Sequence, residues 1–411
     1  MANPDYDVII VGARCAGSPT AMLLARQGYR VLVLDRATFP SDTISTHVVH
    51  PPAVTALRRW GLLDQLTASG CPPVHTYLFD FGPIRISGSP GGEGGVAYCP
   101  RRYALDPILV QAASEADAEV REGATVDGVV ISDGRVTGVR GHRRGGAQFA
   151  ESAAIVIGAD GLRSAVAEAV GADHYHGKPR LLVGYYSYWS GLPMHGRFET
   201  YVRPHRGFAA CNTNDGLTVV IAGWPYSEFE ANRRDIEGSV RRTMQLAPSF
   251  YERLQGATRE TRFVGAAVPN YFRKPYGPGW ALIGDAGYNK DFITAMGIHD
   301  AFRDAELCAT AVDQTLSGER SFDDAMADYQ AARDREVMPM YEFTTQLATL
   351  EPPPEDLQHL LHAMQGNHEA MDAFVRMNAA TLSPTEFFSP ENVQRILAQA
   401  DSAQAQSGVR R

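Results

Sequence analysis

The sequence lacks the cysteine and histidine patterns that hold metals or build disulfide frameworks. It has five cysteines and no C-x-x-C pair, and its histidines do not fall at metal-ligand spacings. An odd number of scattered thiols is typical of a chain that stays reduced. We therefore expect no metal site and a cytoplasmic location. The cysteines are Cys15, Cys71, Cys99, Cys211 and Cys308.

Long apolar runs and a surplus of positive charge are also missing. No uninterrupted apolar stretch reaches the roughly 20 residues that a bilayer-spanning helix needs. The first residues, MANPDYD, lead into a strand without a basic or apolar leader. The 411-residue chain carries a net charge of -9, which a phosphate backbone or an anionic membrane surface would repel. We expect no membrane span and no nucleic-acid partner, and the oligomeric state stays open.

What the sequence does contain begins with a strand, a glycine turn and a helix. VIIVGARCAG, residues 8–17, has the form of a dinucleotide-binding turn, but Arg14 stands where G-x-G-x-x-G has its second glycine. Asp35 follows Gly12 by 23 positions and ends the next apolar strand, where a carboxylate can hold ribose hydroxyls. Taken alone, the segment fits either a nucleotide site or an ordinary β-α-β turn.

Two distant segments favour the nucleotide site. Each places an aspartate directly after a short apolar strand: Asp160 in GADG, residues 158–161, and Asp285 in GDAG, residues 284–287. Ligands of open parallel sheets bind where the strands end, at their carboxyl edge. Three such turns in one chain predict that the strands lie side by side and present their turns to one nucleotide.

The rest of the chain divides into segments with different patterns of apolar and polar residues. Residues 129–152 predict a β-meander with hairpin turns at Asp133-Gly134 and Gly145-Gly146. Residues 181–268 alternate aromatic and polar positions, which predicts antiparallel strands, with one helix from about 235 to 254. A further helix is expected from about 295 to 317, and the chain from residue 338 onward has helical periodicity.

The three turns together resemble the fingerprint of flavoprotein monooxygenases of the p-hydroxybenzoate-hydroxylase type, a family related to FAD-dependent prenyl reductases and halogenases. The resemblance covers roughly residues 5–340. It implies an α/β fold: a Rossmann-type, three-layer FAD-binding domain with an antiparallel substrate sheet and a helical C-terminus. We expect the FAD-binding domain in residues 1–75, 99–175 and 270–335, the substrate domain in 76–98 and 176–269, and the helical segment in 336–411.

The resemblance also implies site residues. The first turn and Asp35 would hold the pyrophosphate and adenosine ribose, Asp285 the ribityl chain or its neighbouring ribose, and the start of the helix near residue 296 the flavin ring. Arg102 matches the family's R-x-x-L element, and Arg14 either contacts a phosphate or points to solvent. The candidate FAD contacts are Gly12, Ala13, Arg14, Ala16, Gly17, Asp35, Arg36, Arg102, Val126, Asp160, Gly161, Gly284, Asp285, Met296, Gly297 and Ile298.

The family chemistry implies a co-substrate and an oxidant. NADH or NADPH reduces the FAD, O2 adds at flavin C4a, and the hydroperoxide hydroxylates an aromatic carbon. Three positions depart from the family pattern: Ala167 replaces an arginine, Phe292 a proline and Thr294 a glycine. The first departure puts the family's nicotinamide-nucleotide contact through Asp160 and Gly161 in doubt. The others leave fine detail at the flavin ring open.

The expected substrate is an uncharged phenol or polycyclic aromatic. No lysine or arginine occurs from Phe208 through Asn232, where hydroxybenzoate-type relatives carry a carboxylate-binding arginine. His47, in STHVVHPP, is a candidate catalytic residue that would orient a phenol or relay its proton, or else a structural histidine. The candidate substrate contacts, which could equally be sheet core, are Tyr186, Tyr188, Tyr201, Phe208, Asn212 and Phe292.

Three other functions remain open at this point. A prenyl or other carbon–carbon double-bond reductase would share the FAD lobe but avoid oxygen. A flavin halogenase is less favoured, because the sequence contains no W-x-W-x-I-P segment. A non-catalytic FAD-binding protein would explain the departures at residues 167, 292 and 294.

Overall fold

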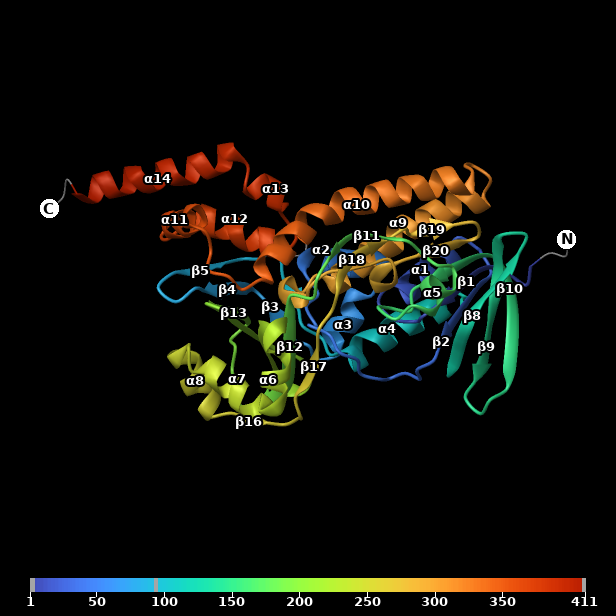
Figure 1. The fold of residues 1–411 in the computed structure, drawn as a ribbon, viewed down its shortest axis with the longest axis horizontal. Coiled ribbons are helices and arrows are strands. Elements are labelled where there is room, and N and C mark those ends of the chain that lie inside the picture. The colour runs from blue at the N-terminus through green and yellow to red at the C-terminus, as the bar shows by residue number, and fades with distance from the viewer. Residues whose placement is uncertain (1–3, 92–94, 409–411) are drawn as a thin grey trace.

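A computed structural model describes residues 4–91 and 95–408. Its first sheet has the strand order β19-β20-β10-β1-β2-β7, and β10 continues into an antiparallel pairing with β9 and β8 (Figure 1). The strands are β1 (Tyr6–Val11), β2 (Val31–Asp35), β7 (Glu119–Glu122), β8 (Ala124–Ser132), β9 (Arg135–Arg143), β10 (Gln148–Gly158), β19 (Tyr276–Gly277) and β20 (Trp280–Leu282).

The parallel strands align so that their carboxyl ends meet. Val11 of β1 pairs with Gly158 of β10, and Gly158 pairs with Leu282 of β20. Because the three glycine turns follow these residues directly, they emerge at one edge of the sheet. The convergence predicted from the sequence is therefore present in the structure.

The sheet is the middle of three layers, which confirms the predicted fold class. Strand side chains alternate between faces, so Val8 and Ile10 pack with α1, α4 and α9, while Ile9 and Val11 pack with the β8–β9 side and α5. Both hairpin turns predicted in the meander are present, with positive φ at Asp133 and at the glycines. The helices are α1 (Gly17–Ala25), α2 (Pro51–Trp60), α3 (Leu63–Ala68), α4 (Arg102–Glu115), α5 (Ala165–Ala169) and α9 (Gly297–Leu316).

The second large sheet has the order β16-β12-β15-β14-β13-β4-β5, with β17 beside β12. Its strands are β4 (Thr76–Asp80), β5 (Arg85–Gly88), β12 (Leu182–Ser190), β13 (Arg197–Arg203), β14 (Arg206–Asn212), β15 (Thr218–Pro225), β16 (Thr258–Arg259) and β17 (Val264–Ala266). Smaller pairings join β3 (Pro73–Val74) to β6 (Ala97–Tyr98), and β18 (Asn270–Arg273) to β11 (His174–Lys178) and β21 (Tyr288–Asn289).

One face of this sheet is covered by α6 (Phe229–Arg234), α7 (Ile236–Met244) and α8 (Pro248–Gln255). The single helix predicted from about residue 235 to 254 is therefore wrong in its continuity. Pro248 has no backbone N–H to continue the preceding helix, so it begins a new one.

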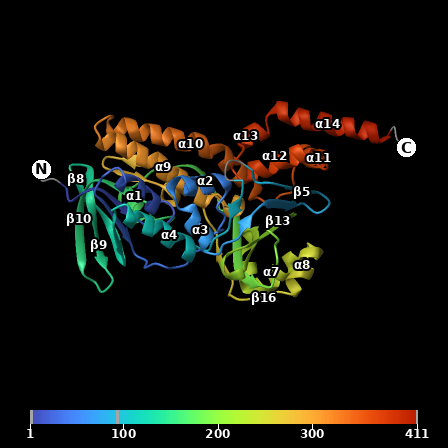
Figure 2. The same ribbon diagram turned by 180° about the vertical axis from the view of Figure 1, so that it is seen from behind.

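The other face of the sheet meets the C-terminal helices. These are α10 (Phe322–Leu347), α11 (Glu355–Ala363), α12 (His368–Asn378), α13 (Pro384–Phe387) and α14 (Pro390–Gly408). In Figures 1 and 2, α11–α14 lie at the end of the molecule opposite the β8–β9 meander. The helix α10 runs without a break across the predicted domain boundary at residues 335 and 336, and the domain division itself stays a prediction.

Within the described part of the chain, no helix is both long and apolar enough to cross a membrane.

Candidate functional site

The first glycine turn has no space for a side chain at Gly12. Gly12 has φ +105°, and a Cβ built there would lie 2.4 Å from the carbonyl oxygen of Ala159. The buried Asp35 carboxylate fastens the same turn to β2, since it accepts hydrogen bonds of 2.7 Å from both the Ala13 and the Ala37 N–H groups. Asp35 thus closes the turn, and its contact with a ribose stays a prediction.

Arg14, which stands where the dinucleotide-binding motif has its second glycine, is held by a carboxylate rather than free in solvent. Its guanidinium pairs with Asp106, donates to Ser41 Oγ at 3.0 Å and lies over the Phe39 ring. Asp106 is fully buried and also accepts from Arg102 Nε at 2.8 Å. Two arginines from different motifs therefore share one acid beside the glycine turn, and Asp106 was not among the predicted site residues.

The third turn packs directly on the first. A Cβ on Gly284 would lie 3.0 Å from Ala16 Cβ, and the Gly284 N–H donates to the buried Asp304 at 3.0 Å. The Asp285 carboxylate is exposed but closely surrounded by protein, and partial desolvation raises its pKa to about 6 against the opposing charge of Arg102. This places Asp285 near both the first turn and the R-x-x-L arginine.

The helix expected to face a flavin ring begins as predicted. Met296 is the N-cap of α9, followed by the exposed Gly297 and the buried Ile298. A helix start leaves several backbone N–H groups without partners inside the helix, and these groups favour a negative charge. Whether these groups face FAD stays a prediction.

The second turn carries an oxygen without a partner. Asp160 Oδ2 accepts hydrogen bonds from Ala165 and Val166, but its buried Oδ1 has none among the described residues. Burial raises the pKa of this carboxyl. A buried acceptor without a hydrogen-bond donor destabilises a fold. The turn therefore has a position next to Gly12 that could accept a hydrogen bond from a ligand.

His47 is a buried, neutral histidine paired with a tyrosine. Its Nδ1 lies 2.6 Å from the Ser45 carbonyl oxygen, which can only accept, so Nδ1 carries the proton. Its Nε2 then accepts from the Tyr188 hydroxyl, and the Tyr186 ring meets the imidazole edge-on at 5.5 Å. Burial lowers the pKa of His47 to about 4.

His50, three residues later, is also hydrogen-bonded to a tyrosine hydroxyl and a backbone carbonyl. Its Nε2–H donates to the Thr294 carbonyl at 3.2 Å, and its Nδ1 accepts from the Tyr77 hydroxyl at 2.9 Å. Burial also lowers its pKa to about 4. His50 therefore holds the backbone that precedes α9.

These two histidines predict a stability loss in acid. An unfolded histidine has a pKa near 6.5, so between pH 6.5 and 4 the unfolded chain binds protons that the folded chain excludes. We expect the free energy of unfolding to fall with decreasing pH in this window, by up to about 1.4 kcal/mol per pH unit for each histidine. Denaturant unfolding at pH 7, 6 and 5 measures it.

Substitution separates the histidine contribution from that of the carboxyls. His47→Asn should reduce the slope, and asparagine tolerates the φ of +71° at this position. The exposed His359 is the control, since His359→Asn should leave the slope unchanged. Equal slopes in wild type and His47→Asn would mean that His47 is not held neutral.

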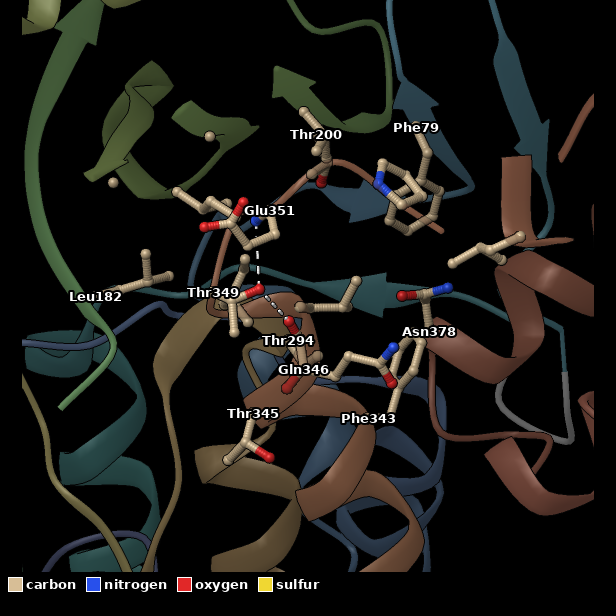
Figure 3. Close-up of a pocket in the computed structure, with 18 of the residues that line it drawn as sticks. Phe79, Leu182, Thr200, Thr294, Phe343, Thr345, Gln346, Thr349, Glu351 and Asn378 are labelled. Carbon is tan, nitrogen blue, oxygen red and sulfur yellow. Dashed lines mark hydrogen bonds between the residues drawn. The ribbon is translucent and has the colours of Figure 1, made fainter. Parts of the chain in front are cut away.

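A large cavity opens between the second sheet and the C-terminal helices (Figure 3). Its volume is about 870 Å³, near the upper end for ligand sites. One side includes Thr294 and Ala295, directly before α9, and Phe292, whose ring occupies the space above Gly184. Apolar lining residues include Val48, Phe79, Phe81, Leu182, Phe198, Ile221, Phe343, Leu347, Leu350, Leu360, Leu361, Phe374 and Phe388.

Only some of the predicted substrate residues line this cavity. Tyr201 and Phe208 border it, but their rings stack on each other at 4.4 Å and pack on Phe250 of α8, behind the sheet. The Asn212 amide is used within the fold, donating to Thr218 and accepting from Met194 N–H. The Tyr186 and Tyr188 rings contact His47.

Comparison with known proteins decides the family. A family model described as FAD binding domain matches residues 5–344. The chain belongs to this family.

Proteins similar to this FAD-binding chain have different activities. This chain is 29% identical over 198 residues to aklavinone 12-hydroxylase DnrF of Streptomyces peucetius, covering 43% of this chain and 40% of the hydroxylase. It is 27% identical over 333 residues to digeranylgeranylglycerophospholipid reductase of Methanosarcina mazei, covering 76% of each. The chondrochloren halogenase CndH shares the fold, with a TM-score of 0.79, 23% identity and 96% of both chains covered. The first curated relatives are thus matched over only 40% of their own length.

The residues at the three turns fit FAD. The helix start after Gly12, the unpaired Asp160 oxygen and the two arginines on Asp106 together suit a pyrophosphate and its neighbouring sugar. Arg36 is exposed at the end of β2, and Val126 packs in the layer between the sheet and the meander. The individual contacts remain predictions.

Two of the departures from the family pattern have a structural explanation. Ala167 lies in the first turn of α5 and is buried in the core beside β10, where a long cationic side chain has no space. Thr294 Oγ1 is hydrogen-bonded to Thr344 Oγ1 at 2.8 Å, which ties the segment before α9 to α10. The family arginine and glycine are therefore replaced by residues that serve packing here.

Proposed function

We propose that this chain is an FAD-dependent monooxygenase that uses NADH or NADPH and O2 to hydroxylate an uncharged phenolic or polycyclic aromatic. The observation that carries the proposal is the composition of the cavity next to the start of α9. Its volume accommodates a molecule larger than one ring. The identity of the nicotinamide nucleotide is left to experiment.

The cavity charges support a neutral substrate. Among the described lining residues there is no arginine, and the lysine, Lys178, is paired with Glu342. Glu351 and Asp356 add further negative charge at the same cavity. A substrate carboxylate would lose its hydration without gaining a counter-ion, which disfavours anionic substrates.

Residues of this chain have defined parts in the proposed reaction. FAD, when bound and reduced, supplies the chemistry that activates O2. The α9 start would offer N–H groups to negative charge on the flavin, and His50 holds the Thr294 carbonyl in place before it. His47 orients the Tyr188 hydroxyl and fixes the loop between Thr46 and Val48, both of which line the cavity.

Oxygen consumption tests the function. Purified protein loaded with FAD should consume O2 with NADH or NADPH about tenfold faster when 2-naphthol is present. The matched anion, 6-hydroxy-2-naphthoate, should stimulate little because the cavity offers it no unpaired cation. Product analysis should find one added oxygen atom. Stimulation by the anion equal to that by 2-naphthol, or by neither compound, would overturn the proposal.

The second candidate is a reductase of carbon–carbon double bonds. It is favoured by the apolar cavity lining and by the reductase relative, which is matched over 76% of its length. Under anaerobic conditions a reductase would reoxidise its reduced flavin on adding a prenyl alkene. A monooxygenase would not, because it requires O2.

A further inference from the structure

The cavity contains one amide that is buried and held in a fixed orientation. Asn378, the last residue of α12, is 9% exposed and lines the cavity. Its Nδ2 donates to the Phe374 carbonyl oxygen at 2.9 Å. Because that carbonyl can only accept, the bond determines which end of the amide is nitrogen and leaves Oδ1 on the other side.

The Asn378 oxygen points into the cavity without a protein partner. In Figure 3 the side chain reaches toward the space near Phe79 and Phe343, with its oxygen on the cavity side. No described residue donates a hydrogen bond to this oxygen, and the surrounding rings cannot do so. An amide oxygen among apolar groups is costly when unpaired, so the position favours an incoming donor.

Other polar groups of the cavity are less suited to select a ligand. Gln346 is exposed and has no side-chain hydrogen bond among the described residues, so its amide is free to reorient. Thr349 Oγ1 already donates to the Gln346 carbonyl oxygen. Thr200 has a hydroxyl that rotates and serves as donor or acceptor. Asn378 is the residue here whose side chain is largely buried and whose acceptor, facing the cavity, is fixed in orientation.

We propose that Asn378 determines specificity by accepting a hydrogen bond from a hydroxyl group of the substrate. The ligand class is a neutral aromatic that carries a free O–H at the end entering between Phe79 and Phe343. This inference rests on the proposed function, because it takes the cavity as the substrate site. It gives the C-terminal helices a direct part in substrate choice.

The test compares two ligands that differ in one donor. Holoprotein is titrated with 2-naphthol and with 2-methoxynaphthalene, and the dissociation constants are read from the change in flavin absorbance. Wild type should bind 2-naphthol about tenfold more tightly, as expected for one hydrogen bond to an oriented acceptor in an apolar cavity. Asn378→Leu should reduce this ratio to near one, because leucine has a similar size but no hydrogen-bond acceptor.

The controls separate this inference from the proposed function. Gln111→Leu removes an exposed amide on α4 and should leave the ratio unchanged. Equal binding of the two ligands by wild type, or a tenfold preference that survives in Asn378→Leu, overturns the role of Asn378 while the cavity remains a substrate site. If neither ligand perturbs the flavin of wild type, both this inference and the neutral-aromatic substrate are wrong. The wild-type comparison does not depend on the variants folding.

Discussion

Gly12→Val is expected to yield protein without bound FAD. Valine would place a Cβ 2.4 Å from the Ala159 oxygen and would need to hold φ +105°, which a β-branched residue strongly disfavours. Relief of the clash moves the β1–α1 turn away from β10, and the backbone N–H groups then no longer converge. We expect at least about a 100-fold loss of FAD affinity, corresponding to about 3 kcal/mol, measured by titrating apoprotein with FAD.

Gly28 provides a matched control at the other end of the same helix. It has φ +91°, but no atom lies within 4 Å of a Cβ built there. Gly28→Val therefore introduces similar backbone strain without the clash, and it should lower stability while FAD binding persists. Retention of full flavin by Gly12→Val, or equal flavin loss in both variants, would show that the turn does not form the nucleotide site.

Asp106→Leu is expected to be strongly destabilising. The change removes the shared partner of Arg14 and Arg102 and leaves at least one buried guanidinium uncompensated. Loss of one side of a buried ion pair costs about 3–5 kcal/mol. We expect a drop of that size in the free energy of unfolding of the apoprotein, measured by denaturant unfolding.

FAD should rescue part of this loss. If the two arginines also face the pyrophosphate, saturating FAD neutralises them, and the destabilisation of the holoprotein should be smaller than that of the apoprotein. Asp7→Asn is the control, because it breaks the largely exposed pair with Arg30 and should cost less than about 1 kcal/mol. Equal losses with and without FAD would place Arg14 and Arg102 away from the phosphates.

The nucleotide turns were predictable because their chemistry is local. A buried strand ending in glycine and an acid has the same meaning wherever it occurs, and the rule that parallel strands end at one edge brings the turns together. The pairing of Asp106 with Arg102 was also predictable, since Asp106 stands four residues after Arg102 on one helix and residues at this spacing share a face.

The substrate side was predicted less well, because alternation along a strand does not reveal what covers each face. Tyr201 and Phe208 alternate as a substrate-facing pair would, yet their rings pack on Phe250. The face toward the cavity instead presents Phe198, Thr200 and neighbours, opposite helices more than 100 residues later in the chain. Only long-range packing chooses between the two faces.

By itself, the sequence determined the family, the three-layer nucleotide-binding fold and the positions of its turns, because each depends on short stretches whose backbone needs are set by a few residues. Tertiary structure decided which acid pairs with Arg14, why Ala167 and Thr294 stand where relatives have other residues, and that α10–α13 form a wall of the cavity. These features depend on contacts between residues far apart in the chain, and no local pattern encodes which distant surfaces will meet.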